Sequence, residues 1–169
     1  MTGFSSARWC VVVAVSLVVA ACAGAEWRHV AVAPTYHAPK QLRVTLVAQA
    51  STEHSAEALQ VMQEALADGL ASKGITASFG PAPDDQPQAS VTLAQWDQGS
   101  RALRYFVGFG TGEGSIVVFV KSPSADGQVG VEGEARGWVK GGMFGGSSYN
   151  AASEAGHLIA EAIATGRTK

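Results

Sequence analysis

The sequence predicts a single α/β domain: a mixed β-sheet of about five strands, with two helices packed on one face. Several segments between residues 41 and 140 alternate apolar and polar side chains, which is typical of half-buried strands. Two other segments carry apolar residues at spacings of three and four, which is typical of amphipathic helices. A chain of 169 residues has room for one domain and a short additional segment. The predicted order is β-α-β-β-β-β-α.

The first strand and the first helix are predicted close together. Residues 41–50 alternate Leu, Val and Ala with polar side chains and predict the strand. Residues 51–55 supply side chains that can cap a helix, and the helix itself is predicted over 56–73. Gly74 is well placed to end it. The apolar positions of this helix are Leu59, Met62, Leu66 and Leu70.

Four further strands and a second helix complete the predicted domain. The strands cover residues 75–79, 89–98, 115–121 and 128–140. A turn over 124–127 joins the last two strands into a hairpin. The second helix covers 149–165, and the serines at 147–148 are interpreted as its cap.

The N-terminal segment has the form of a secretory signal peptide over residues 1–21. Arg8 precedes an apolar run, and small residues follow it. The alternative is an uncleaved membrane helix, since the uncharged run of about 17 residues lies at the lower limit for crossing a bilayer. No basic cluster follows the run, which favours the signal peptide.

The end of that segment, Val19-Ala20-Ala21-Cys22, resembles the bacterial lipobox. The resemblance implies that Cys22 carries lipid and becomes the first residue of the mature protein, and two or three acyl chains anchor a protein stably. Ala23 follows, where aspartate tends to retain lipoproteins at the inner membrane of Gram-negative bacteria. We therefore expect an outer-membrane anchor with the domain facing the periplasm; the inner membrane and the cell surface are the alternatives. Cys10 leaves with the signal peptide, so the mature domain has no free thiol and no disulfide.

Between the lipidated cysteine and the domain, residues 22–40 are predicted to be a tether. Residues 23–40 are rich in Ala and Pro and lack steady periodicity, and 18 extended residues would reach about 60 Å. Within this tether, residues 30–32 could form a short edge strand. The domain is expected to span 41–169.

The sequence carries no recognisable catalytic or cofactor motif. A net charge of −2 with scattered Lys and Arg disfavours nucleic-acid binding. The glycines at 108–114 fail the dinucleotide pattern, because Glu113 takes the third position and a strand follows. We expect no enzyme activity, no metal and no cofactor. The alternative is an enzyme acting on envelope polymers through Asp84, Asp97, Glu113 or a histidine.

Two glycine-rich segments place large apolar side chains beside flexible backbone. They are candidate partner contacts, and the alternative is that their apolar residues cap the core while the glycines permit sharp turns. The candidate contact residues are Arg101, Arg104, Tyr105, Phe106, Phe109, Met143 and Phe144.

These two segments, at 99–112 and 142–147, precede an Ala/Glu-rich helix and resemble an uncharacterised bacterial lipoprotein family (domain of unknown function 4410). The resemblance covers roughly residues 43–165 and implies an envelope lipoprotein with no known enzymatic activity. We expect a lipid-anchored binding or assembly module whose partner is an envelope protein or a second copy. A small-ligand carrier, with its pocket between sheet and helices, is the alternative.

Overall fold

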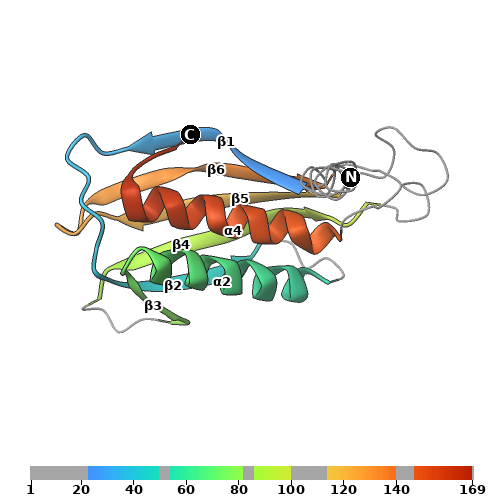
Figure 1. The fold of residues 1–169 in the computed structure, drawn as a ribbon, viewed down its shortest axis with the longest axis horizontal. Helices are drawn as coiled ribbons and strands as arrows, with labels where there is room; N and C mark the ends of the chain where they lie inside the picture. Colours follow the sequence, from blue (N-terminus) through green and yellow to red (C-terminus); the bar gives the residue numbers. More distant parts are fainter. Residues whose placement is uncertain (1–22, 50–53, 82–85, 100–113, 140–146, 169) are drawn as a thin grey trace, which may run out of the picture.

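The computed structural model describes residues 23–49, 54–81, 86–99, 114–139 and 147–168. These ranges contain a six-stranded sheet and two helices (Figure 1). The strands are β1 (Ala23–Val32), β2 (Gln41–Ala48), β3 (Thr76–Phe79), β4 (Gln88–Asp97), β5 (Gly114–Pro123) and β6 (Val129–Val139). The helices are α2 (Ser55–Ser72) and α4 (Ser148–Thr165).

The sheet is mixed, with the strand order β1-β6-β5-β4-β2-β3. The strands β1, β6, β5 and β4 pair antiparallel with one another, whereas β2 runs parallel to both of its neighbours, β4 and β3. Helices α2 and α4 lie side by side on one face of the sheet (Figure 1). The predicted fold class is confirmed, with six strands in place of about five.

The additional strand is β1, where a tether was expected. Residues 23–32 pair antiparallel with β6 over the whole strand, from Ala23 opposite Val139 to Val32 opposite Val131. The expectation of an 18-residue tether is therefore wrong for these residues. The cause lies in β6, which already pairs with β5 on one side and offers its second row of backbone groups to β1.

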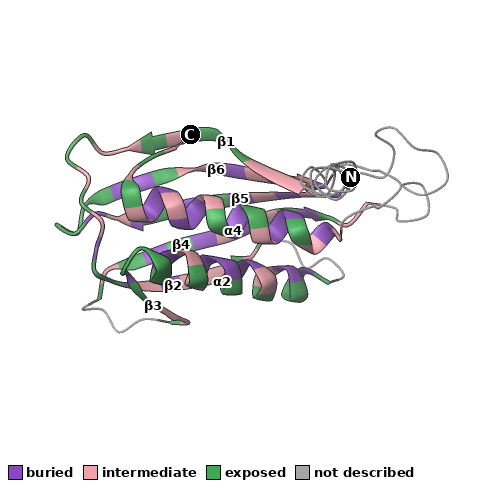
Figure 2. Cartoon of the chain, viewed as in Figure 1, coloured by how far each residue is buried: buried purple, intermediate pink, exposed green. Residues whose placement is uncertain are grey.

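The core lies between the helices and the sheet. Figure 2 shows the buried residues of both helices on the sides that face the sheet. Along β5, Ile116, Val118 and Val120 are buried, and the residues between them are not. From the helices come the buried residues Ala58, Met62, Leu66, Leu70, Ala151, Ala152, Ala155, Ile159 and Ile163.

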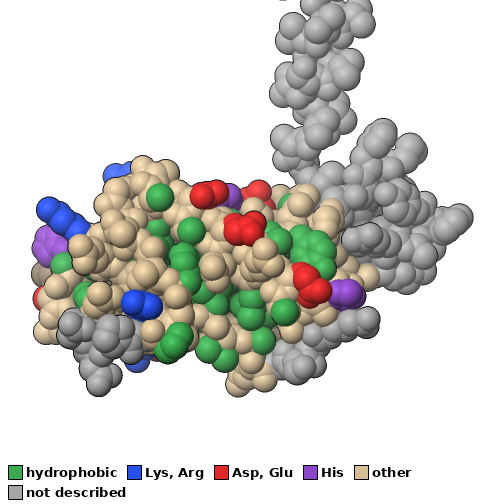
Figure 3. Space-filling view, turned by 90° about the horizontal axis from the view of Figure 1, so that it is seen from below, with side chains coloured by type: hydrophobic (Ala, Val, Ile, Leu, Met, Phe, Trp, Pro, Cys, Tyr) green, Lys and Arg blue, Asp and Glu red, His purple; other side chains and the backbone are tan. Residues whose placement is uncertain are grey.

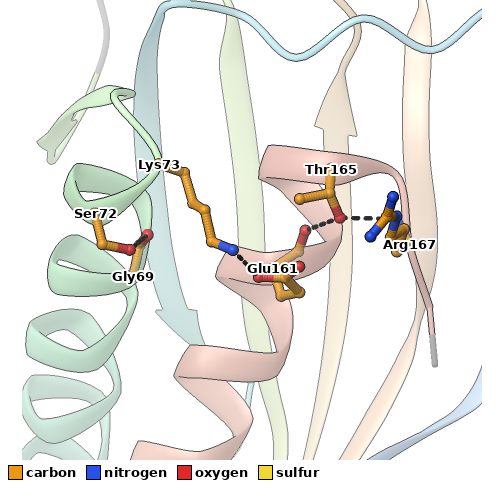
Figure 4. Close-up of polar contacts among 6 residues, drawn as sticks. All are labelled: Gly69, Ser72, Lys73, Glu161, Thr165 and Arg167. Atoms are coloured by element: carbon orange, nitrogen blue, oxygen red, sulfur yellow. Dashed lines mark hydrogen bonds and ion pairs between the residues drawn. The ribbon is translucent and has the colours of Figure 1, made fainter.

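The two helices approach each other closely because small residues occupy their contact. A Cβ atom at Gly69 would lie 2.5 Å from the Cβ of Ala160, and one at Gly156 would lie 2.7 Å from the carbonyl oxygen of Met62. At the end of the contact, Lys73 Nζ lies 2.7 Å from Glu161 Oε2 (Figure 4). The hydrogen bond from Lys73 lowers the pKa of Glu161.

The ends of the helices use different caps. At the start of α2, His54 has a left-handed φ of 63° and makes no side-chain cap hydrogen bond. The predicted serine cap of α4 is confirmed, because the Tyr149 N–H donates to Ser147 Oγ at 3.3 Å. Gly166, with a φ of 65°, ends α4 in the left-handed conformation that glycine tolerates.

The connection from β1 to β2 is also held against the domain. The Ala33 N–H donates to the Gly130 carbonyl at 2.8 Å. The Tyr36 hydroxyl donates to the carbonyl of Ile163 near the end of α4. Burial raises the pKa of Tyr36 to about 12.

Within the described ranges, neither helix is long and apolar enough to cross a membrane.

Candidate functional site

The residues proposed from the sequence as lipid and partner sites lie outside the described residues. They are Cys22, Arg101, Arg104, Tyr105, Phe106, Phe109, Met143 and Phe144. The structure does place the described residues to which their segments attach, because Ala23 pairs with Val139, Val139 with Gly114, and Ser115 with Asp97. We name this end of the sheet, formed by Ala23, Asp97, Gly114 and Val139, the anchor end.

The N-terminus of α4 belongs to the same end. The Ser148 hydroxyl donates to the Gln98 carbonyl at 2.5 Å, just after β4 ends. A Cβ at Gly114 would lie 2.8 Å from Ser148 Oγ, so a side chain at this position would displace the Ser148 hydroxyl from its contact. The sheet thus brings together the attachment points of both glycine-rich segments and of the N-terminal segment.

The candidate binding surface among the described residues is the sheet face opposite the helices, here called the open face. Strand alternation turns every second side chain of each strand onto it. The register aligns one continuous row across five strands, through direct pairs of neighbours. In order from β1 to β2, this row consists of His29, Glu134, Phe119, Thr92 and Val47.

Large apolar side chains are exposed in this row. Phe119 is 47% exposed and Val47 is 50% exposed, and β5, which carries Phe119, is an interior strand of the sheet. Two rows toward the anchor end, Trp138 covers β1, since a Cβ at Gly24 would lie 2.9 Å from the Trp138 ring. The open face therefore combines an aromatic centre with an aromatic side chain nearer the anchor end.

A hollow of about 570 Å³ lies on the open face. It is an open depression rather than an enclosed cavity, and it crosses β1, β6, β5 and β4. Its lining mixes apolar, hydroxyl and charged side chains: His29, Val30, Ala31, Ser90, Thr92, Phe119, Val120, Lys121, Glu132 and Glu134, with the backbone of Gly133. The small-ligand hypothesis expected its pocket between sheet and helices, where the structure instead has packed core residues.

A β-bulge sets the charges beside this hollow. The register of β1 shifts between Trp27 and His29, and Arg28 is the extra residue. Arg28 Nη1 donates to Glu134 Oε1 at 2.8 Å. Gly133 permits the close approach, because a Cβ there would lie 2.4 Å from the His29 carbonyl oxygen. Gly133 interrupts the alternating pattern of β6, and a glycine at such a place is a sequence signal of a bulge or a close backbone approach, although it did not lead to a predicted bulge.

The open face carries both signs of charge. Lys121 lies opposite Glu132, and Arg136 lies opposite Glu26, in the rows on either side of Phe119.

Among the described residues, no group of three or more His, Cys, Asp or Glu side chains is arranged to hold a metal ion. Asp97, one of the residues considered for catalysis, accepts a hydrogen bond from the Gly99 N–H at 2.8 Å and so shapes the end of β4.

The side of the molecule formed by α2 and β3 has a different character. There, hydrophobic side chains form a band, and the acidic groups and the Lys and Arg side chains gather toward different ends (Figure 3). A shallow hollow of about 430 Å³ on this side is lined by Ala67, Asp68, Ala71, Gly74, Ile75, Thr76 and Ala77. It has no aromatic side chain, and its acidic residue lies on the exposed surface of α2.

Comparison with known proteins identifies a family and a fold. No curated protein matches the chain. A solved PelC dodecamer from Paraburkholderia phytofirmans is similar with a TM-score of 0.53 and 15% identity, covering 82% of this chain and 95% of that chain. A point variant of the PelC dodecamer has a TM-score of 0.52 and 16% identity over the same shares. These likenesses show a shared fold. A family model matches residues 29–166, so the chain belongs to the family described as a domain of unknown function (DUF4410).

Proposed function

We propose that this protein is a lipid-anchored envelope lipoprotein that acts by binding, joining to other copies of itself through the open face. Acyl groups on Cys22 hold it in the outer membrane, and the domain faces the periplasm. The role is assembly rather than catalysis. The lipobox-like residues before Cys22 support the anchor, and the geometry of the open face supports the contact between copies.

The observation that carries the proposal is the exposure of Phe119 and Val47 in one row of the helix-free face. An antiparallel or mixed sheet commonly leaves one face to water, and that face is then polar. Here an interior strand instead presents a half-exposed phenylalanine above a hollow of about 570 Å³. Aromatic side chains at the centre of a charged rim are the usual anchors of protein interfaces.

The charges around Phe119 suit a second copy of the chain. Lys121 and Arg136 provide cations, and Glu132 and Glu26 provide carboxylates on the same face. Because both signs are present, each can meet the opposite sign on a copy, which favours the correct partner over others. A two-fold dimer would pair the open face with itself, and a ring would pair it with a different patch. Both arrangements bury Phe119.

The solved neighbours add support of another kind. Both PelC structures that share this fold are dodecamers. A domain of this architecture is therefore compatible with a closed homo-oligomer. The identity of 15–16% carries only the fold, so the number of copies in this protein is left to experiment.

The anchor is tested by the intact mass of the protein extracted from cell membranes, beside a Cys22→Ser variant. We expect a product that starts at Cys22 and carries acyl mass, and we expect the variant to lose that mass. Retention of residues 1–21 without acyl mass would contradict the proposal and indicate an uncleaved membrane helix.

Assembly is tested by native mass spectrometry of the detergent-extracted protein with Phe119→Glu. The matched control is Gln63→Glu on the exposed side of α2, which changes the net charge equally. Burying the exposed half of a phenylalanine contributes about 1 kcal/mol, and a buried unpaired charge costs more, so association should weaken roughly tenfold or more. A Phe119→Glu variant that assembles like the control would refute the contact. A monomeric wild-type protein would instead favour a different envelope protein as partner.

One observation favours a second candidate function, the binding of a small ligand. The hollow on the open face falls within the 300–1,000 Å³ range of ligand sites and offers Phe119 together with hydroxyl and charged groups. A compound that leaves the native protein on denaturation, and that the Phe119→Glu variant does not retain, would support this reading over self-association.

A further inference from the structure

We infer that the domain is mounted directly on the membrane, without a flexible linker, so that the anchor end faces the lipid surface and the sheet stands end-on. This inference deepens the proposed function and rests on the lipidation of Cys22. The contact surface is the anchor end, and its partner is the phospholipid bilayer that holds the acyl chains.

The first step concerns the distance between the lipid and the fold. Residue 23 is the first residue of β1, and its Cα partner across the ladder is Val139. Consecutive Cα atoms are 3.8 Å apart, so a lipid attached to the residue before Ala23 would be separated from the sheet by a single peptide unit. A lipidated cysteine at that place therefore leaves no slack between the bilayer interface and the anchor end.

The second step concerns rigidity. Nine of the ten residues of the edge strand β1 pair with β6, and β6 also pairs with β5, so the point of attachment is held to the sheet by a full ladder of backbone hydrogen bonds. Helix α4 begins at the same end, where the Ser148 hydroxyl donates to the Gln98 carbonyl. Moving the anchor end away from the membrane would require unzipping β1 from β6, which breaks ladder hydrogen bonds.

The third step concerns the side chains near that end. Trp138 lies in the row next to Ala23 and Val139, half-buried against Gly24 on the open face. Trp96 stacks on Tyr149 near the same end with ring centroids 5.7 Å apart, but it is buried in the core, so Trp138 is the side chain that carries this step. Trp and Tyr are the residues enriched at membrane–water interfaces, because one part of the ring is apolar and the other polar.

The far end of the sheet is about 30 Å away, since β5 runs for ten residues at about 3.3 Å per residue. It carries the exposed basic residues Lys40, Lys73 and Arg167. In Figure 3 the Lys and Arg side chains gather toward the left of the view. An anionic bilayer would attract these basic groups and would favour the far end at the membrane. The covalent attachment at Cys22 favours the anchor end there instead, and we expect the covalent attachment to determine the orientation.

The end-on orientation has a consequence for assembly. The strands then run away from the membrane, and the open face stands perpendicular to the bilayer plane. Copies that diffuse in one membrane meet with their open faces already directed sideways. Restricting the approach in this way reduces the rotational freedom lost on association.

The test measures the height of two labels above the membrane. The full-length chain is expressed, extracted with its lipid and reconstituted into vesicles of phosphatidylethanolamine, with or without one quarter phosphatidylglycerol, that carry a headgroup acceptor dye. Single donor dyes are attached at Ser115→Cys, at the anchor end, or at Asp126→Cys, in the β5–β6 turn at the far end. Both positions belong to one hairpin, so each serves as the control for the other.

We expect energy transfer from position 115 to exceed transfer from position 126 by roughly threefold or more in both vesicles, because the labels differ in height by ~30 Å. An 18-residue Gly/Ser spacer inserted between Cys22 and Ala23 should abolish that ratio. If Cys22 carries acyl mass but transfer from positions 115 and 126 is equal, the proposed orientation is wrong and the lipid anchor is still supported. The same conclusion follows if anionic lipid makes transfer from position 126 the larger. A ratio that survives the spacer also overturns the orientation, and absence of acyl mass overturns anchor and orientation together.

Discussion

From the contact between α2 and α4 we predict how adding or moving a single methyl group changes the stability of the protein. Gly69 of α2 faces Ala160 of α4, and a Cβ at Gly69 would lie 2.5 Å from the Ala160 Cβ, whereas ordinary contacts begin at 3.4 Å. The substitution Gly69→Ala therefore pushes the helices apart by about 0.9 Å at this point. The obstacle is a Cβ atom, so no change of rotamer relieves it.

The energies of the two single substitutions follow from this geometry. Alanine gains about 1 kcal/mol over glycine inside a helix, while overpacking costs about 1–3 kcal/mol, so Gly69→Ala should destabilise by roughly 1 kcal/mol. Ala160→Gly loses about 1 kcal/mol of helix propensity and about 0.8 kcal/mol for the buried methyl, so it should cost roughly 2 kcal/mol. Each substitution alone is unfavourable.

The double substitution transfers the methyl group from α4 to α2. The propensity changes then cancel and the contact is refilled, so Gly69→Ala/Ala160→Gly should lie within about 0.5 kcal/mol of the parent protein. The coupling free energy is therefore roughly 2–3 kcal/mol in favour of the pair. The assay is equilibrium urea unfolding followed by circular dichroism in a Cys22→Ser background. Additive effects of the two substitutions would refute the proposal that this methyl sets the helix separation.

Three further predictions concern the core, a buried phenol and the open face. Leu66→Ala removes a fully buried side chain and should lower the free energy of unfolding by about 2–5 kcal/mol, while Gln63→Ala on the exposed side of α2 should change it by less than about 0.5 kcal/mol in the same urea assay. Tyr36 should ionise near pH 12 in an absorbance titration, with that step missing in Tyr36→Phe. Because its folded pKa lies above the ordinary 10.0, the unfolded chain loses this proton first, so the contribution is complete below about pH 10 and declines as pH rises toward 12. Arg28→Ala removes a half-exposed ion pair with Glu134 and should cost less than about 1 kcal/mol; a larger loss would show that the bulge depends on this pair.

Periodicity was a sufficient guide for the elements with one buried face. The alternation of β5 and the 3–4 spacing of α2 appear in the structure as buried and exposed sides, with ends within about two residues of those predicted. Strand β1 escaped the sequence reasoning because Ala23–Val32 mixes small, charged and aromatic residues and has a bulge at Arg28, which breaks the period. β1 forms because β6 supplies its backbone hydrogen-bond partners, and this pairing cannot be predicted from the residues of β1 alone.

For the candidate site too, some features were predicted from the sequence and others depend on the pairing of strands. Sequence reasoning located large apolar side chains beside glycines, and those residues lie outside the described ranges. It did not find the open face, because Phe119 and Val47 appear in the sequence as ordinary apolar members of strands. Only the pairing of β5 with β4, and of β4 with β2, brings them into one row.

The sequence by itself determined the α/β class, the order of most elements, the capping serine of α4 and the resemblance to the family described as a domain of unknown function. These are local properties, since they depend on side-chain spacing along one segment. The tertiary structure alone decided the strand order β1-β6-β5-β4-β2-β3, the incorporation of β1 and the face left without helices. Those features depend on hydrogen bonds and packing between segments far apart in the chain, which no local pattern encodes.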